Sequence, residues 1–182
     1  MRVSWVVLSY RLPREPSRLR LAAWRRLKRL AAALLHDALW VLPADARTHE
    51  AFEWLAEEIG EAGGTVLTFE AQSFGAAQDA AMVAAFTAEA DARYGELAES
   101  ARAIHRVWAR RRPSDTARLQ QVRRQLAGLE RALRLERRRD YFRARGRSDA
   151  EAAIRTARDL LERRLQAASP LEWKGASGAV GH

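Results

Sequence analysis

The amino-acid sequence predicts an α+β protein, in which a small sheet domain is followed by a helical extension. In residues 1–75, short apolar and β-branched runs alternate with segments whose apolar residues recur at helical spacing. From residue 76 onward only the helical spacing persists, with interruptions at Pro113 and at residues 143–148. We therefore expect a sheet domain at 1–75, a helical domain at 76–168 and a flexible tail at 169–182.

Three strands of the sheet domain follow directly from residue type. Residues 3–9 form an almost unbroken apolar run, which is typical of a strand covered on at least one face, and Pro13 ends it. Residues 39–42 (LWVL) and 65–70 (TVLTFE) are short and rich in branched and aromatic side chains. Each of these runs is separated from the next by a segment long enough for a helix.

Two helices are expected in those separations. The first spans about residues 17–30 with Ser17 as its N-cap, and the second begins at Thr48 and ends at Gly63–Gly64. The first has a strongly basic outer face, whereas the second has an acidic one. Core packing is the predicted role of four tryptophans at core-facing or strand positions: Trp5, Trp24, Trp40 and Trp54.

Residues 32–35 decide the topology of the sheet domain. If they form a strand, the element order is βαββαβ, the ferredoxin-like arrangement of an antiparallel sheet with two helices on one face. If they continue the preceding helix, only three strands remain. We favour the strand.

The second half is predicted to contain three helices, at 76–109, 115–142 and 149–168, each with an apolar stripe. Gly95 could kink the first of them, and residues 143–148 (RARGRS) form the loop before the last. Two of these helices are expected to form an antiparallel hairpin.

The charge of the chain is divided into blocks. The sequence contains 32 basic and 23 acidic residues, and 30 of the basic residues are arginine. Residues 1–36 carry a net charge of +8, residues 37–75 of −7, residues 76–101 of −4 and residues 102–147 of +12. Arginine forks suit phosphate and other oxyanions, although a GC-rich genome gives the same bias. Basic blocks of this size favour an anionic partner such as nucleic acid.

Several classes of protein are disfavoured. Cysteine is absent, which excludes disulfides and thiol catalysis. The N-terminal apolar run is too short for a signal peptide or a membrane span, so we expect a soluble, cytoplasmic, bacterial protein without a membrane partner. The four histidines lack metal-ligand spacing, and neither a phosphate-cradling glycine loop nor a serine elbow is present. We therefore predict a protein that is not an enzyme and holds no metal or cofactor.

The first candidate anion site is the basic helix at 17–30. Arg18, Arg25 and Arg29 are spaced by seven and four residues, so they stack along about 10 Å of one helix face, with Arg14 preceding them and Lys28 beside them. Such a row can follow a line of phosphates. The alternative is an ordinary solvated helix face.

The second candidate is the arginine-rich block at 102–147, where sixteen arginines face four acidic residues. The candidate contacts are Arg110, Arg111 and Arg112 at a helix end, and Arg124, Arg131 and Arg138, which recur every seven residues opposite a leucine stripe. The alternatives are a coiled-coil surface or pairing with the acidic helix at 48–61.

Three segments resemble the N-terminal domain of the ChrB chromate-resistance family. They are residues 10–43 (YRLPREPSRLRLAAWRRLKRLAAALLHDALWVLP), residues 47–59 (RTHEAFEWLAEEI) and residues 136–142 (ERRRDYF). The resemblance covers about residues 1–165. It implies a chromate-responsive regulator of a chromate-efflux operon, with a DNA-binding and oxyanion-sensing role and chromate as effector. Our first hypothesis is such a regulator, acting as a homodimer. Family members often carry a further C-terminal domain, which we do not expect in these residues.

No helix-turn-helix is predicted, so DNA affinity would rest on arginine–phosphate contacts and would fall steeply with salt. An alternative function is a protein-interaction or oxyanion-sensor module that acts with a partner chain and does not bind DNA. In that case the basic helices would dock on acidic surfaces, including the 48–61 helix of a second copy.

Overall fold

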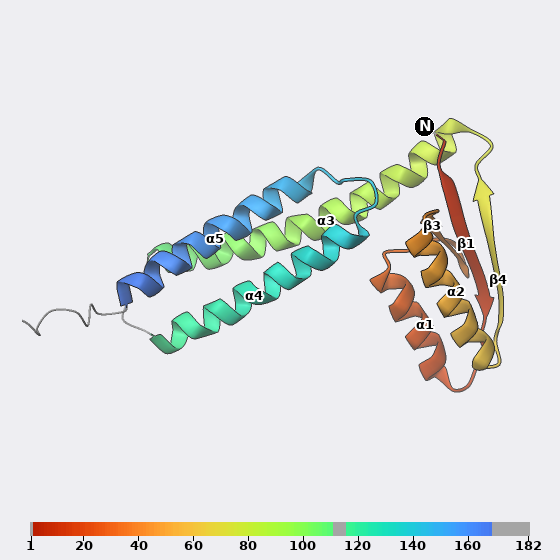
Figure 1. The fold of residues 1–182 in the computed structure, drawn as a ribbon, viewed down its shortest axis with the longest axis horizontal. Coiled ribbons are helices and arrows are strands. Elements are labelled where there is room, and N and C mark those ends of the chain that lie inside the picture. The colour runs from red at the N-terminus through yellow and green to blue at the C-terminus, as the bar shows by residue number, and fades with distance from the viewer. Residues whose placement is uncertain (1, 111–115, 169–182) are drawn as a thin grey trace, which may run out of the picture. The chain divides into compact units, whose positions relative to one another are not determined.

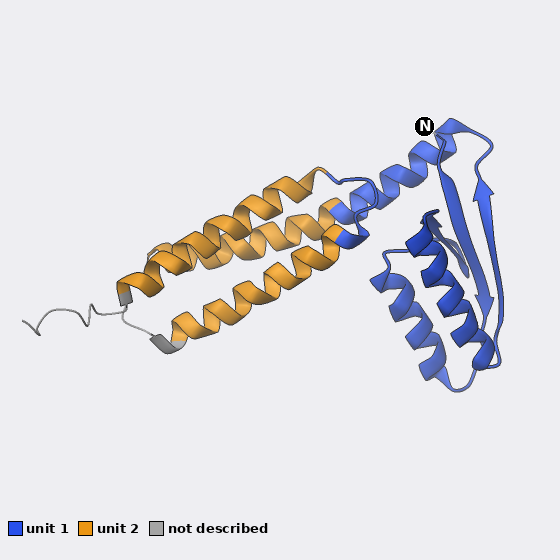
Figure 2. Cartoon of the chain, viewed as in Figure 1, with its two compact units in different colours: residues 1–90, 138–144 blue, residues 91–137, 145–182 orange. Residues whose placement is uncertain are grey.

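The computed structural model describes residues 2–110 and 116–168, and the chain separates into two compact units. Unit 1 comprises residues 1–90 and 138–144, and unit 2 comprises residues 91–137 and 145–182 (Figure 2). The elements in chain order are β1 (Ser4–Arg11), α1 (Ser17–Arg29), β2 (Ala33–His36), β3 (Leu39–Pro43), α2 (Ala46–Glu61), β4 (Thr65–Gln72), α3 (Ala76–Ala109), α4 (Thr116–Arg139) and α5 (Gly146–Ala168).

Unit 1 contains a four-stranded antiparallel sheet in the order β2-β3-β1-β4, with α1 and α2 together on one face (Figure 1). The central strand β1 pairs with both neighbours, so that Val7 lies opposite Val41 on one side and Phe69 on the other. The element order confirms the ferredoxin-like prediction. The uncertain segment at 32–35 is a strand, shifted by one residue to Ala33–His36.

Strand β1 forms the centre of the core and is covered on both faces. Successive side chains of a strand point to opposite faces, so Val6 and Leu8 face one way while Trp5 and Val7 face the other. All four are buried, and Leu8 is completely inaccessible to solvent. This burial accounts for the continuous apolar run in the sequence, which an alternating pattern would not produce.

An aromatic cluster extends the core beyond residues 1–75. The Trp5 ring stacks on Phe86 of α3 at 5.8 Å between centroids and contacts Phe142 at 6.0 Å. Phe86 also meets Phe142 edge-on at 5.7 Å. Aromatic pairs of this kind contribute about 0.5–1.5 kcal/mol each beyond their burial. The first turns of α3 and the segment 138–144 therefore stabilise the sheet unit.

A buried carboxylate holds the start of β1. The Trp5 indole Nε1 donates to Asp79 Oδ1 at 2.9 Å, and the Val3 amide donates to Oδ2 at 3.2 Å. Hydrogen bonds from the Ser73 side chain and from the Trp5 indole lower the pKa of Asp79. Asp79 therefore remains a hydrogen-bond acceptor in its charged form.

Both helix caps differ from the prediction. Ser17 is the first helical residue of α1, and the N-cap position belongs to Pro16, which makes no side-chain cap. The Ser17 amide instead donates to the Glu15 carboxylate at 3.3 Å. The N-cap of α2 is Asp45, three residues before the predicted cap, because Asp45 and Thr48 form a reciprocal capping box.

Two of the four tryptophans were wrongly assigned to the core. Trp5 and Trp40 are buried, but Trp24 on α1 is 48% exposed and Trp54 on α2 is 55% exposed. Ala23 and Leu27 supply the buried face of α1 instead, and Phe52 and Leu55 that of α2. Both exposed rings stand immediately beside a buried residue in their helix, at the border of the apolar stripe.

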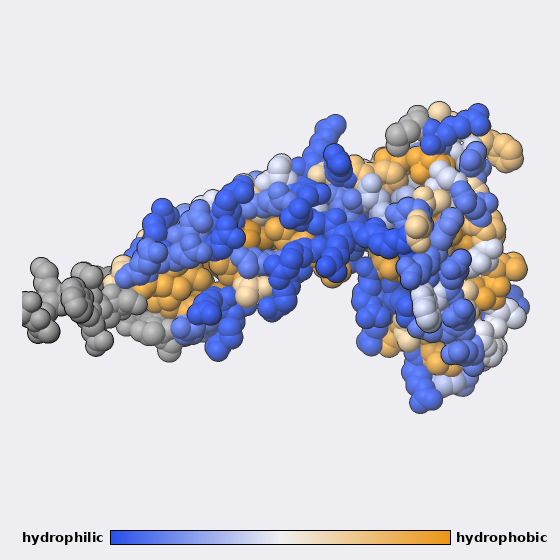
Figure 3. Space-filling model, viewed as in Figure 1, coloured by the Kyte–Doolittle hydropathy of each residue, from blue (hydrophilic) through white to orange (hydrophobic). Residues whose placement is uncertain are grey.

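Unit 2 packs α3, α4 and α5 around one core, so it is a three-helix arrangement and not only a two-helix hairpin. Its buried residues include Trp108 from α3, Leu119 and Leu126 from α4, and Ile154 and Leu161 from α5. Hydrophilic side chains lie on both sides of a hydrophobic seam in this unit (Figure 3).

The helix boundaries in the second half also differ from those predicted. Helix α3 continues through Gly95 as one element. Helix α4 ends at Arg139, three residues earlier than predicted, and α5 begins three residues earlier at Gly146, whose amide donates to Asp91 Oδ1 at 2.7 Å. Within the described ranges, no helix combines the length and the apolar composition needed to cross a bilayer.

The glycines after α2 give a direct test of this fold. A Cβ on Gly64 would lie 2.8 Å from the Arg11 carbonyl oxygen and 2.9 Å from the Ile59 carbonyl oxygen, and neither backbone atom can move away freely. We expect Gly64→Ala to lower the free energy of unfolding by about 1–3 kcal/mol, measured by urea denaturation.

Gly60 is the matched control, because a Cβ there meets nothing within 4 Å and the residue is helical. Gly60→Ala should raise the free energy of unfolding by about 0.5–1 kcal/mol. Equal stability of the two variants would contradict the close approach at Gly64.

Candidate nucleic-acid interface

Helix α1 presents a row of exposed guanidinium groups. Ala23 and Leu27 bury one face of the helix, and Arg18, Arg25 and Arg29 are exposed. Among the described residues, no carboxylate forms an ion pair with these three side chains. They are therefore available to an anion outside the chain.

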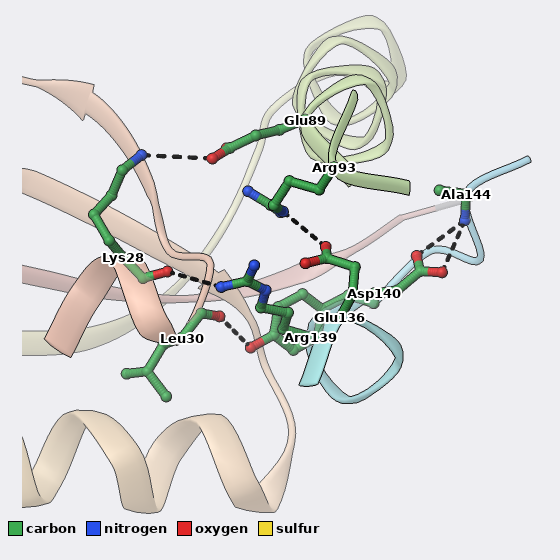
Figure 4. A network of polar contacts seen from close by, with 9 residues as sticks. Lys28, Leu30, Glu89, Arg93, Glu136, Arg139, Asp140 and Ala144 are labelled. Carbon is green, nitrogen blue, oxygen red and sulfur yellow. Dashed lines mark hydrogen bonds and ion pairs between the residues drawn. The ribbon is translucent and has the colours of Figure 1, made fainter. Parts of the chain in front are cut away.

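The other cations of α1 are already engaged. Arg26 forms an ion pair with Glu58 of α2, and Lys28 Nζ lies 3.5 Å from Glu89 Oε1 on α3 (Figure 4). Exposed pairs of this kind contribute little to stability, but they reduce the positive charge offered to a ligand. Lys28 is thus the least available of the five contacts predicted for the basic helix and the turn before it.

Arg14 lies in the turn that leads into α1. The Arg20 guanidinium donates to the Pro13 carbonyl at 3.0 Å and also to the Arg14 carbonyl. These bonds hold the backbone of the turn, while the Arg14 side chain remains exposed. Arg20 therefore positions Arg14 and is not itself a free contact.

The C-terminal end of α1 is held by residues that are distant in the sequence. The Arg139 guanidinium donates to the Lys28 carbonyl at 3.5 Å, and the Tyr141 hydroxyl donates to the Leu30 carbonyl at 2.8 Å (Figure 4). The last carbonyls of a helix have no hydrogen-bond partner within the helix. A cation near them also interacts favourably with the negative end of the helix dipole. Residues 138–144 thus fix the end of the basic helix.

A second carbonyl contact fixes this short segment in turn. Arg47 of α2 donates to the Arg138 carbonyl, and its guanidinium lies 5.3 Å from the centre of the Tyr141 ring. The Ala144 amide donates to the Asp140 carboxylate at 2.9 Å (Figure 4). Sequence reasoning missed these positioning residues. The only signal was the placement of ERRRDYF at a helix end.

The remaining predicted contacts are divided between the two units. Arg110, Arg124 and Arg131 are exposed in unit 2, and Arg138 is exposed in unit 1. Arg111 and Arg112 lie outside the described residues. Arg93 is different from this group, because it donates to the nearly inaccessible Glu136 at 2.8 Å (Figure 4).

In residues 2–110 and 116–168, no three histidine, aspartate or glutamate side chains are grouped so that they could hold a metal ion. What the arrangement offers chemically is an array of permanent positive charges with planar, forked donors.

Comparison with known protein families identifies a match over most of the chain. The family model described as "Protein ChrB, N-terminal" matches residues 20–167, which extend from α1 into α5. No curated protein and no solved structure matches the chain.

Tyr141 provides a test of whether residues 138–144 hold the C-terminal end of α1, through its hydrogen bond to the Leu30 carbonyl. Burial raises the pKa of Tyr141 to about 12, above its unfolded value of about 10. The neutral phenol therefore stabilises the fold fully below pH 10, and this contribution is lost as the pH rises from about 10 to 12.

We expect Tyr141→Phe to lower the free energy of unfolding by about 0.5–1.5 kcal/mol at pH 8, because the bond to Leu30 is lost. Between pH 9.5 and 11.5 the gap between variant and parent should narrow in urea denaturation. A gap that stays constant over that range would show that Tyr141 does not hold the helix end as a neutral donor.

Proposed function

The chain belongs to the ChrB N-terminal family, which is associated with chromate resistance, and from this premise we propose that it is a chromate-responsive, DNA-binding transcriptional regulator. We propose further that it is not an enzyme, that it acts in the cytoplasm as a homodimer, and that it controls a chromate-resistance operon with chromate as its effector.

The observation that supports DNA binding is the exposed cation row on α1. Arg18, Arg25 and Arg29 have no carboxylate partner in the described chain, while the neighbouring Arg26 and Lys28 do. Arginine contacts to phosphate oxygens supply most of the sequence-independent affinity for DNA and release condensed counterions. Arg25 and Arg29 lie inside the family match, as do Arg124, Arg131 and Arg138.

The proposed contacts orient the protein on DNA and leave sequence reading to other groups. Phosphate contacts fix register and orientation, whereas specificity comes from base edges or from the shape of the duplex. Clamping both ends of α1, through Arg20 at the preceding turn and Tyr141 at the last carbonyls, keeps the row rigid. A rigid row loses less conformational entropy when it binds a backbone.

Reversal of two charges tests this interface. We expect Arg25→Glu/Arg29→Glu to weaken binding to its own upstream DNA and to scrambled DNA alike, by at least tenfold at 100 mM salt. The slope of log K against log salt should fall in magnitude by about 2, since two phosphate contacts are lost. Fluorescence anisotropy with labelled duplexes measures both quantities.

The matched control is Arg2→Glu/Arg163→Glu, which changes the net charge equally at two exposed positions outside the proposed interface. If both double variants lose DNA affinity to a similar extent, the loss comes from the change in net charge and not from contacts of α1. Circular dichroism and unfolding midpoints establish that the folds remain intact. Unchanged binding in the α1 variant would refute the assignment of this helix.

A protein-interaction module is the second candidate, and one feature of α2 favours it. The exposed Trp54 ring is flanked on the same helix by the exposed carboxylates of Glu50, Glu53 and Glu57. An exposed aromatic residue among charges of one sign is typical of a contact with an oppositely charged partner. The basic helix α1 of a second copy has the complementary charge.

If this contact forms, Trp54→Ala should weaken self-association by about tenfold in sedimentation experiments, and 500 mM salt should weaken it further. Trp24→Ala, which also removes an exposed indole, tests whether α1 supplies the other half. If self-association is unchanged by both tryptophan substitutions and by salt, the proposed contact between α2 and the α1 helix of a second copy is wrong.

A further inference from the structure

A groove between α4 and α5 in unit 2 has an unusual charge arrangement. It encloses about 370 Å³ and is lined by residues of these two helices only. The lining residues are Glu130, Leu133, Arg134, Arg137, Glu151, Ile154, Arg155 and Arg158. None of its arginines belongs to the candidate nucleic-acid interface.

Two ion pairs cross the groove and define its register. Arg137 Nε of α4 lies 3.4 Å from Glu151 Oε1 of α5, and Arg158 Nη1 of α5 lies 3.8 Å from Glu130 Oε1 of α4. The residue number rises along one helix as it falls along the other, so the helices are antiparallel. Each pair places a cation opposite an anion.

Between these two ion pairs, each helix contributes an arginine, so within the described chain no anion lies opposite a cation there. Arg134 lies between Glu130 and Arg137 on α4, and Arg155 lies between Glu151 and Arg158 on α5. Both line the same groove, and neither has a carboxylate partner among the described residues. Two like charges facing the same space repel each other unless an anion lies between them.

The nearby carboxylates cannot serve as that anion. Glu151 already lies 3.1 Å from Arg147 as well as 3.4 Å from Arg137. Glu130 is engaged by Arg158. Four arginines and two glutamates leave the lining with a net charge of +2.

The shape and the polarity of the groove suit a small ligand. Its volume is about 370 Å³. One water molecule occupies roughly 30 Å³ in the liquid, so the groove has room for a small ligand together with water. Leu133 and the buried Ile154 contribute apolar surface beside the guanidinium groups. Guanidinium forks bind the oxygens of a tetrahedral oxyanion through paired, charge-assisted hydrogen bonds.

We propose that this groove binds a tetrahedral oxyanion dianion, such as sulfate, chromate or hydrogen phosphate, bridged between Arg134 and Arg155. The site differs from the α1 row in its elements and its residues. The assignment of a dianion does not depend on DNA binding. Only its use as an effector site for chromate rests on the proposed function.

Sulfate titration tests the site without redox chemistry. The rise in unfolding midpoint that sulfate causes over chloride at equal ionic strength should be larger for the parent than for Arg134→Gln/Arg155→Gln, because general salt exclusion stabilises both but only the parent binds the ligand in its folded state. Isothermal titration should show Arg134→Gln/Arg155→Gln binding sulfate at least tenfold more weakly. In chloride alone, the same variant should keep its midpoint or raise it, since a repulsion has been removed.

Arg123→Gln/Arg163→Gln is the matched control, because it removes two exposed arginines of α4 and α5 that do not line the groove. Its affinity for sulfate should stay within about twofold of the parent. Equal loss in both double variants, or no loss in the groove variant, would overturn the proposal. A groove variant that is less stable in chloride would also overturn it, since the two arginines would then be structural.

The source of the oxyanion is decided by running the same variants with duplex DNA. A groove variant that loses DNA affinity but keeps its sulfate affinity would overturn the free-dianion assignment in favour of a backbone phosphate. Loss of sulfate and chromate affinity with unchanged DNA affinity in the absence of oxyanion supports it. If the parent binds sulfate but no DNA, the proposed function fails while the groove assignment stands.

Discussion

The sheet unit depends on side chains that return to it after the chain has formed most of another unit. Trp5 is in the first strand, yet its ring contacts are Phe86 and Phe142, and its indole nitrogen donates to Asp79. Residues 91–137 separate the two later parts of this cluster. The entropy of closing such a loop grows only logarithmically with its length, so a large insertion is compatible with a stable core. The basic helix also depends on the segment that follows this insertion, because Arg139 and Tyr141 donate to its last carbonyls.

The contacts of each arginine say more about its role than the number of arginines does. Arg20, Arg26, Arg47 and Arg139 donate to carbonyls or carboxylates within unit 1 and thus belong to its structure. Arg25 and Arg29 come from the same basic block but have no such partner in the described chain. A guanidinium group is permanently charged, so each unpaired one contributes to an electrostatic field that only an external anion can satisfy.

The sequence predicted the element order well, because each strand and helix shows its own hydrophobic period. The segment at 32–35 is ambiguous in the sequence, since four apolar residues after a helix suit either a strand or more helix. Trp24 and Trp54 were misassigned, because a residue at the border of an apolar stripe turns inward or outward according to packing that periodicity does not record. The predicted N-caps were also wrong. Ser17 and Thr48 are both suitable residue types for an N-cap, but the N-cap residues in the structure are Pro16 and Asp45. Spacing along the sequence could not identify the groove arginines, because Arg134 and Arg155 line one groove only as a result of the antiparallel register of α4 and α5.

The discontinuity of unit 1 has a consequence for synthesis on the ribosome. The strands β1 to β4 and the first turns of α3 emerge before the segment that completes their core. At about 5–20 residues per second, roughly 3 to 11 seconds pass between the synthesis of residue 90 and that of residue 144. During that interval the Trp5 and Phe86 rings lack their contacts with Phe142, and the Leu30 carbonyl at the end of α1 lacks the Tyr141 hydroxyl. Helix α4 must therefore be synthesised before the core of unit 1 can be completed.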